Sequence, residues 1–321
     1  MRILSGIQPT GQLHIGNYFG MMRPMINNMD RGELFAFIVN YHALTSVQNP
    51  ASLIRDTMGA AADFLALGLD PERSVFWVQS DVPEVTELAW VLSTVAPMGL
   101  IERCHSYKDK IAKGIAASHG LFSYPVLMAA DILLFQANQV PVGKDQKQHI
   151  EVARDIAIKF NGTYGETFVI PEPMIDDNLA TVPGLDGQKM SKSYGNTIGI
   201  FLDAKELKKR VMAIVTDSAP VEAAKDPDQC NLFNIYKLFA PTDRLREVRN
   251  LYLNGGAAYG RIKLELVDLL WEYFRSARET REKLLADPAQ IKDILKSGAV
   301  KAREKAGATL EKVRERVGLR Y

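Results

Sequence analysis

The sequence is poor in cysteine and contains no long apolar run. Only two of its 321 residues are cysteines, and Cys104 and Cys230 stand far apart, outside any C-x-x-C pair. This usage argues against a disulfide framework, and neither a zinc site nor an iron–sulfur cluster is expected. No stretch reaches the ~18 apolar residues that a membrane-spanning helix needs, and the first residues lack the apolar core of a signal peptide. We therefore expect a cytoplasmic protein that does not bind a membrane.

The chain also lacks a net charge of either sign. Its 39 Lys and Arg residues are nearly balanced by 38 Asp and Glu, which leaves a net charge of +1. Because no global positive excess points to nucleic acid, any RNA-binding surface must be local. Residues 301–321 hold seven Lys or Arg against three Glu, which suits an RNA-facing tail. Such a charge run is, however, more often the solvated face of a helix.

In the first half of the chain, short apolar runs alternate with segments of helical periodicity. Strands are predicted at residues 1–4, 34–39, 74–78, 139–142 and 167–170. Helices are predicted at residues 17–29, 51–67, 86–95, 121–136 and 145–160. This alternation favours an α/β fold with a parallel sheet, whose ligands bind at the carboxyl ends of the strands.

The pattern changes after residue 204, from where only helices are predicted. Their expected positions are residues 207–215, 232–239, 244–253, 259–285, 289–295 and 300–317. Prolines separate several of them, which is typical of helix boundaries. The sequence therefore predicts a helical domain behind the α/β domain.

The segment QPTGQLHIGN, residues 8–17, connects the first predicted strand to a helix. A helix start presents unpaired N–H groups and the positive end of the helix dipole, which suits a phosphate. Gly11 and Gly16 let a ligand approach the backbone, and His14 and Asn17 share one face of the helix. This segment is a candidate phosphate site, although a loop with a structural His would look similar.

A second polar segment, KMSKS at residues 189–193, is flanked by Gly184, Gly187 and Gly195. Its two lysines on a glycine-bordered loop indicate a mobile cationic arm. Together and in this order, HIGN at residues 14–17 and KMSKS resemble the two signatures of class I aminoacyl-tRNA synthetases. The remainder is similar to the bacterial-type tryptophanyl-tRNA synthetase family. The matching blocks are SGIQP (5–9), YHALT (41–45), QSDVPE (79–84), YPVLMAADIL (124–133) and GKDQ (143–146).

The resemblance implies a domain plan and a reaction. A Rossmann-like parallel-sheet catalytic domain is expected at residues 1–195, with an insertion near residues 80–125 that carries the contact of a homodimer. A helical anticodon-binding domain is expected at residues 196–296, and a C-terminal helix within residues 297–321 is expected to pack back on the catalytic domain. The family activates L-tryptophan with ATP and Mg²⁺ to tryptophanyl-adenylate, releases pyrophosphate and transfers tryptophan to the 3′ end of tRNA(Trp).

The resemblance also places ATP against specific residues. The expected ATP-binding residues are Gln8, Pro9, Thr10, Gly16, Asn17, Gly143, Lys144, Asp145, Val182, Lys189, Met190, Ser191, Lys192 and Ser193. The residues expected to act in catalysis are His14, Asn17, Lys189 and Lys192, the two lysines by neutralising the triphosphate in the transition state. Lys110 is a further candidate for phosphate contact, and Val182 fits a core valine nearly as well.

Selectivity for tryptophan is expected to centre on Asp131. Its carboxylate would accept the indole N–H, which is the one polar atom of the tryptophan side chain. A buried acceptor of this kind discriminates against phenylalanine by about 10⁴ or more. Asp131 lies in an otherwise apolar run, although a helix cap or an ion pair would also place it there. The other expected tryptophan-binding residues are Leu4, Gln8, His42, Tyr124, Met128 and Gln146.

Three positions depart from the family pattern. Leu4 stands where an aromatic residue is frequent, Asn40 where an acidic one is common, and Lys144 where Glu is usual.

Three other functions are alternatives to a tryptophanyl-tRNA synthetase. A nucleotidyltransferase would share the phosphate cradle but would not need the helical half. A tyrosyl-tRNA synthetase would need partners for a phenol O–H, which the matching blocks do not offer. A non-catalytic tRNA-binding paralogue commonly loses signature residues, whereas both signatures and Asp131 are intact here.

Overall fold

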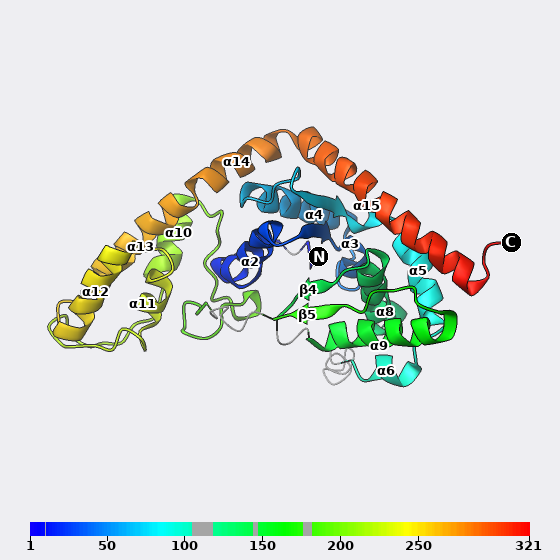
Figure 1. Ribbon diagram of the computed structural model, residues 1–321. Coiled ribbons are helices and arrows are strands. Elements are labelled where there is room, and N and C mark those ends of the chain that lie inside the picture. Colours follow the sequence, from blue (N-terminus) through cyan, green and yellow to red (C-terminus); the bar gives the residue numbers. More distant parts are fainter. Residues whose placement is uncertain (10, 105–117, 144–146, 176–181) are drawn as a thin grey trace. The chain divides into compact units, whose positions relative to one another are not determined.

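The computed structural model describes residues 1–9, 11–104, 118–143, 147–175 and 182–321 (Figure 1). The chain forms two compact units, each assembled from separate segments. The first unit comprises Met1–Gly11, Met25–Asp177 and Leu284–Tyr321, and the second comprises Gln12–Pro24 and Asn178–Lys283. The domain boundaries expected near residues 195 and 296 stay a prediction.

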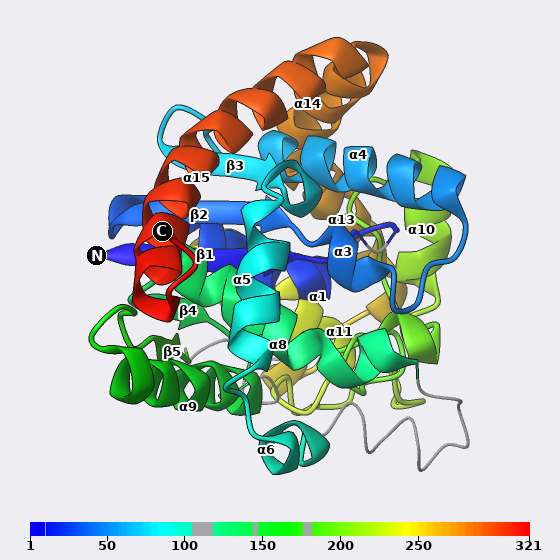
Figure 2. The same cartoon turned by 90° about the vertical axis from the view of Figure 1, so that its right-hand side faces the viewer.

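A five-stranded parallel sheet forms the centre of the first unit. Its strands are β1 (Arg2–Ile7), β2 (Glu33–Ile38), β3 (Ser74–Val78), β4 (Gln139–Pro141) and β5 (Glu172–Met174). They lie in the order β3-β2-β1-β4-β5, and every neighbouring pair is parallel (Figure 2). The predicted α/β fold with a parallel sheet is thereby confirmed. The three longest strands are largely buried, as expected for parallel strands covered on both faces.

The fifth strand lies in a different place from the one predicted. Residues 167–170 form a loop, and the strand is Glu172–Met174. Side chains accept hydrogen bonds from the backbone of this loop. The Asn161 Oδ1 accepts hydrogen bonds from the N–H groups of Thr167 and Phe168, and the Gln136 Oε1 accepts one from the N–H of Val169. Because these backbone N–H groups already donate to amide side chains, they cannot form hydrogen bonds with a neighbouring strand.

Helices cover both faces of this sheet. The α-helices that lie wholly or mainly in this unit are α2 (Arg23–Asn27), α3 (Asn40–Ala43), α4 (Pro50–Ala66), α5 (Glu84–Ser93), α6 (Met98–Glu102), α8 (His119–Leu134), α9 (Lys147–Tyr164) and α15 (Pro288–Val317). On one face, α5, α8 and α9 pack over a core that includes Phe35, Phe37 and Trp77. Trp77 stacks on Phe37 with ring centroids 5.0 Å apart. On the other face, Phe64 of α4 meets Phe76, the neighbour of Trp77 that points to the opposite side.

The last helix, α15, is one continuous element of 30 residues, whereas two separate helices were predicted there. It packs along β3, which Figure 2 shows beside it. Gly298, one of the four residues between the two predicted helices, explains the difference. A Cβ atom at this position would lie 1.8 Å from the Phe76 carbonyl oxygen. Gly298 is therefore needed for close contact between helix and strand and does not break the helix.

The second unit is predominantly helical. It contains α1 (Ile15–Asn17), the π-helix η1 (Tyr18–Met22), the 3₁₀-helix η5 (Lys192–Tyr194), α10 (Ala204–Met212), α11 (Asn231–Tyr236), α12 (Thr242–Asn254), α13 (Tyr259–Tyr273) and most of α14 (Arg275–Ala286). Residues 204–321 are all described and their regular elements are helices, as predicted. The helix predicted at 259–285 is interrupted at Phe274 and forms α13 and α14. None of the helices in the described residues combines the length and the apolar character that crossing a membrane requires.

The contact between Gly298 and β3 yields a stability test. Gly298→Ala forces a methyl group into the Phe76 carbonyl, so we expect the free energy of unfolding to fall by about 3 kcal/mol or more. Gly307→Ala is the matched control in the same helix, because no atom lies within 4 Å of its added Cβ. That change should be neutral or stabilise by up to about 1 kcal/mol. Urea unfolding followed by circular dichroism measures both, and equal midpoints for the two variants would contradict the packing argument.

Candidate active site

In the first unit, polar residues follow the carboxyl ends of the central strands. Gln8 follows β1, the short helix α3 begins two residues after β2, and Gln79 directly follows β3. This is the edge at which parallel α/β sheets bind ligands. Helix α8 also contributes to the site. Its residues Tyr124, Met128 and Asp131 are spaced by four and three positions and share one face of the helix.

The Asp131 carboxylate is buried, with 3% of the residue exposed, and receives hydrogen bonds from two side chains. The His42 Nε2 donates to its Oδ2 over 2.7 Å. The Gln79 Nε2 lies 2.8 Å from Oδ1 and 2.9 Å from Oδ2, and so donates to both oxygens. We call Asp131, His42 and Gln79 the carboxylate cluster. Buried charge is costly unless hydrogen-bonded, and these donors supply that compensation.

Gln79 is itself fixed in orientation. It is 1% exposed, and its Oε1 accepts the backbone N–H of Tyr41 over 3.0 Å. A backbone N–H cannot donate to an amide NH₂ group, so the oxygen must face Tyr41 and the nitrogen must face Asp131. Tyr41 and His42 are consecutive residues of α3. One helical turn therefore orients Gln79 through its backbone and contacts Asp131 through a side chain.

Tyr124 lies beside this cluster. Its ring centroid is 6.2 Å from that of His42, and its hydroxyl shares a 2.5 Å hydrogen bond with the Nε2 of the buried His149 on α9. Leu4 belongs to the hydrophobic core on this face of the sheet, and Met128 packs against that core.

The structure thus brings His42, Tyr124, Met128 and Asp131 into one region, and their contacts with tryptophan stay a prediction. Gln8 is exposed, Pro9 is buried, and Gly143 follows β4. Thr10, Lys110, Lys144, Asp145 and Gln146 lie outside the described residues, and their roles stay predictions.

The first signature, residues 14–17, lies in the second unit, where His14 caps α1. The His14 Nδ1 accepts the backbone N–H of Asn17 over 3.2 Å, and the Asn17 Oδ1 accepts the N–H of His14 over 3.3 Å. Burial and the nearby charge of Lys192 lower the pKa of His14 to about 4. The ring is therefore neutral at pH 7, with its proton on Nε2. His14 offers a hydrogen-bond donor to a ligand and contributes no positive charge.

Gly16 is required by packing inside this unit. A Cβ atom there would lie 2.9 Å from the His14 Nδ1 and 3.2 Å from the Cβ of Met190, so the two signatures are in close contact. The backbone strengthens this connection, because the Ile15 N–H donates to the Ile198 carbonyl and that of Ile200 to the Leu13 carbonyl. The role that the sequence suggested for Gly16, to let a ligand approach, stays a prediction, and the structure adds that Gly16 lets the second signature approach.

The side chain of Asn196 supports the second signature, residues 189–193, through hydrogen bonds. This residue is 4% exposed. Its Oδ1 accepts the N–H of Ser191, and its Nδ2 donates to the Asp186 Oδ1 and to the Lys189 carbonyl. Gly184 must be glycine, since a Cβ there would lie 2.2 Å from the Asn196 Nδ2. The buried side-chain amide of Asn196 therefore links Asp186, Lys189 and Ser191 and fixes the conformation of the loop.

The predicted residues of this loop divide into two groups. Lys189, Lys192 and Ser193 are exposed, so their side chains can reach a ligand, and the half-buried Ser191 joins them through a hydrogen bond between its Oγ and that of Ser193. Val182 and Met190 are buried and joined by a backbone hydrogen bond, which places them in the support of the loop. The loop is also tied to α11, because the Asn231 Nδ2 donates to the carbonyls of Gly184 and Leu185.

Three residues of these sites received no role from the sequence. Gln79 lies in a matching block, directly behind a buried strand, and that position was the available signal. His149 falls on the apolar stripe of α9, where a histidine fits a core position equally well. Asn196 follows a polar loop, and nothing in its neighbours indicates that it is buried.

Known proteins resemble this chain over nearly its whole length. The family described as "tRNA synthetases class I (W and Y)" matches residues 1–267. The tryptophan–tRNA ligase of Campylobacter jejuni is 54% identical over 319 residues, which cover 99% of this chain and 100% of that protein. The tryptophan–tRNA ligase of Rhodopirellula baltica is 52% identical over 320 residues, which cover 100% of both chains.

Solved structures agree with these sequences. The crystal structure of tryptophanyl-tRNA synthetase from Campylobacter jejuni, complexed with ADP and tryptophan, superposes with a TM-score of 0.95 at 54% identity. The match covers 99% of this chain and 100% of that one. The chain therefore belongs to the class I tRNA synthetases and, within them, to the family of tryptophan–tRNA ligases.

Proposed function

We propose that the carboxylate cluster recognises the indole of tryptophan and that the loop at residues 189–193 stabilises the phosphates of ATP. The activity follows from the family: the chain is a tryptophan–tRNA ligase. It activates tryptophan with ATP to the adenylate and then esterifies tRNA. The observation that carries the residue assignment is the buried Asp131 carboxylate, which is surrounded by hydrogen-bond donors at the ligand-binding edge of the sheet.

Indole recognition requires an acceptor in an apolar setting. An ionised carboxylate has only acceptor sites, so it matches the single N–H donor of indole. A phenylalanine side chain would leave the buried acceptor without this donor, and a site built on such a hydrogen bond can discriminate by about 10⁴ or more. Met128 and Leu4 supply apolar surface for the ring, and we assign the Tyr124 hydroxyl to the α-ammonium group. The Tyr124–His149 hydrogen bond would fix that hydroxyl.

The activation step needs positive charge more than covalent help. The tryptophan carboxylate attacks the α-phosphate, the bond to the β-phosphate oxygen breaks, and pyrophosphate leaves with its charge. Cations beside the phosphate oxygens stabilise the negative charge that develops in the transition state, which lowers the barrier to adenylate formation. Lys189 and Lys192 extend from the loop that Asn196 holds, and the neutral His14 offers its Nε2–H. We assign charge neutralisation to the lysines and hydrogen bonding to His14 and Asn17.

ATP is the expected nucleotide, which the ADP complex of the Campylobacter jejuni relative supports. We propose that Mg²⁺ arrives with ATP, because this ion is commonly held by substrate phosphates and water with few protein ligands. Across the described ranges no group of three or more His, Cys, Asp or Glu side chains is placed to hold a metal. Gln8, Pro9, Gly16 and Gly143 remain proposed contacts of the nucleotide.

We further propose that helices α10 to α14 read the tRNA anticodon. Support comes from their position in the chain after the second signature and from the basic residues of α14, which include Arg275, Arg278 and Arg281. Such side chains bind the RNA backbone. A cytoplasmic location also stays a proposal, and the two buried cysteines, which are free thiols, fit a reducing compartment.

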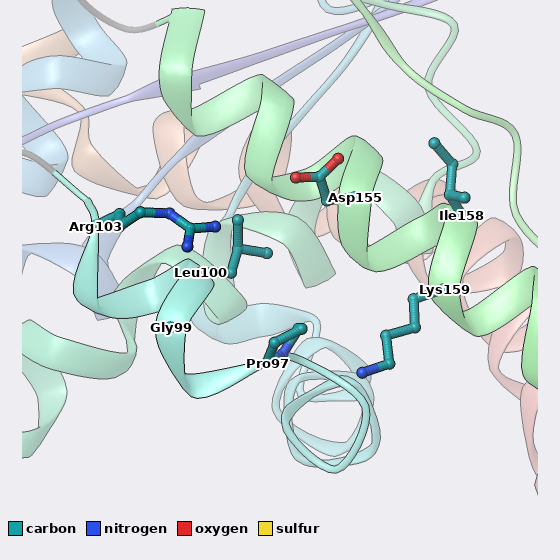
Figure 3. Close-up of a pocket in the computed structure, with 7 residues that line it drawn as sticks. All are labelled: Pro97, Gly99, Leu100, Arg103, Asp155, Ile158 and Lys159. Atoms are coloured by element: carbon teal, nitrogen blue, oxygen red, sulfur yellow. The ribbon is translucent and has the colours of Figure 1, made fainter.

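A homodimer is proposed through the surface formed by α6 and α9. A pocket of about 360 Å³ lies there. Figure 3 shows the residues that line it, which are Pro97, Gly99, Leu100, Arg103, Asp155, Ile158 and Lys159. Ile158 is 54% exposed and the neighbouring Met98 is 63% exposed. Exposed apolar residues around a pocket are typical of a surface that another protein covers.

Changing Asp131 tests tryptophan recognition. Asp131→Ala removes the acceptor and leaves its two donors without a partner, so the KM for tryptophan in ATP–pyrophosphate exchange should rise by about a hundredfold or more. The KM for ATP serves as the internal control and should stay near the wild-type value. An unchanged KM for tryptophan would remove Asp131 from the pocket.

The loop lysines are tested by transient kinetics. Lys192→Ala should slow single-turnover formation of the adenylate by about 10² or more, because charge stabilisation in the transition state is lost. ATP binding, measured by equilibrium titration, should weaken far less. Lys208→Ala, which removes an exposed lysine from α10, is the matched control and should keep the wild-type rate. Equal rates for Lys192→Ala and the control would refute the assignment.

The dimer proposal predicts a change in mass. Ile158→Glu places a charge in the proposed interface, and sedimentation velocity should show a shift from dimer to monomer. Val300→Glu is the matched control, since Val300 is another exposed apolar residue, 71% exposed on α15. A monomeric wild-type protein, or a dimer that survives Ile158→Glu, would contradict this interface.

A further inference from the structure

The carboxylate cluster leaves few acceptor sites open on Asp131. A carboxylate has about four lone-pair positions on its two oxygens. The contacts of His42 and Gln79 involve Oδ2 twice and Oδ1 once. The oxygen with the fewer contacts is therefore Oδ1, and it is the one with room for a further donor. Gln79 approaches both oxygens from one nitrogen, so it also fixes the plane in which the carboxylate lies.

The orientation of Gln79 is set without any ligand. Its Oε1 is held by the Tyr41 N–H, so its NH₂ group must face the carboxylate. It follows the buried strand β3, and only 1% of the residue is exposed. A side chain held in this way cannot turn to offer Asp131 an acceptor, and rotation of the carboxylate would disrupt its hydrogen bonds with both Gln79 and His42.

From this arrangement we propose that Gln79 is a specificity-determining positioning residue, which holds the Asp131 carboxylate so that Oδ1 accepts the indole N–H of tryptophan. The inference rests on the proposed role of Asp131 and extends it. Gln79 acts through Asp131 and does not itself touch the substrate. Its contribution is therefore specific to substrates that carry the N–H donor.

This specificity separates positioning from a merely structural role. The analogue β-(benzothiophen-3-yl)alanine has a shape close to that of tryptophan, but sulfur replaces the N–H group and no hydrogen bond can be donated. A variant that only loosens the fold should lower activity with both substrates to a similar degree. A variant that misaligns the carboxylate should lower activity with tryptophan selectively.

The experiment measures kcat/KM in ATP–pyrophosphate exchange for tryptophan and for this analogue, using the full chain. In Gln79→Met the preference for tryptophan should fall by about tenfold or more, which is the scale of a hydrogen bond to a charged group. The loss should appear in the KM for tryptophan, with kcat and the KM for ATP near wild type. Adding Gln79→Met to Asp131→Ala should not change the preference further, because the two residues act as a unit.

Two further variants keep the test sharp. Gln79→Glu retains the size of the side chain and an acceptor for the Tyr41 N–H, but it places a second carboxylate against Asp131, so the preference should fall at least as far. Ser80→Ala is the matched control at the same strand end. It deletes the 2.8 Å hydrogen bond from the Asn40 Nδ2 without touching the cluster, and the preference should stay that of wild type.

The outcomes distinguish this inference from the proposal beneath it. If Asp131→Ala loses the preference while both Gln79 variants keep it, positioning by Gln79 is overturned and the role of Asp131 stands. Equal losses with tryptophan and the analogue in the Gln79 variants would also overturn it. If Asp131→Ala keeps the wild-type preference, the indole assignment itself fails and the role of Gln79 fails with it.

Discussion

A carboxylate buried beside the apolar core imposes the constraint on which the ligand-binding edge of the first unit depends. The Asp131 carboxylate can be buried there only if several donors reach it, and these donors come from α3 and from the end of β3. The ends of two strands and one face of α8 must therefore keep a fixed geometry even without substrate. The hydrogen bonds that offset the cost of burying the Asp131 carboxylate also hold it rigidly. A rigid acceptor discriminates between ligands better than a mobile one.

The loop at residues 189–193 of the second unit must expose its lysines to solvent and still keep a defined conformation. Asn196 and Asn231 satisfy backbone groups of the loop from its buried side, while Lys189 and Lys192 remain at the surface. Gly16 and Gly184 permit the close contacts on which this support depends. Order in the base of the loop and exposure at its tip are therefore compatible.

The sequence predicted the parts of the structure that depend on patterns along the chain. The sheet and most helices follow from apolar runs and periodicity, and His42, Tyr124 and Asp131 follow from a family resemblance. The pattern failed where side chains replace the backbone ladder, as Asn161 and Gln136 do at residues 167–169, and where Gly298 serves a contact that is distant in sequence. Gln79, His149 and Asn196 were missed because their partners are set by tertiary structure, which no local pattern records.

The docking of α15 on β3 has a consequence for the order of events during synthesis. β3 is an edge strand of the sheet, and α15 is made after every other described element of the first unit. Between the two, the ribosome must produce more than two hundred residues, which takes on the order of ten seconds or longer at typical rates. During that interval the nascent chain carries an uncovered sheet edge, the kind of surface that pairs with other unfinished chains. Binding of the nascent chain by chaperones is therefore expected to matter most before α15 emerges.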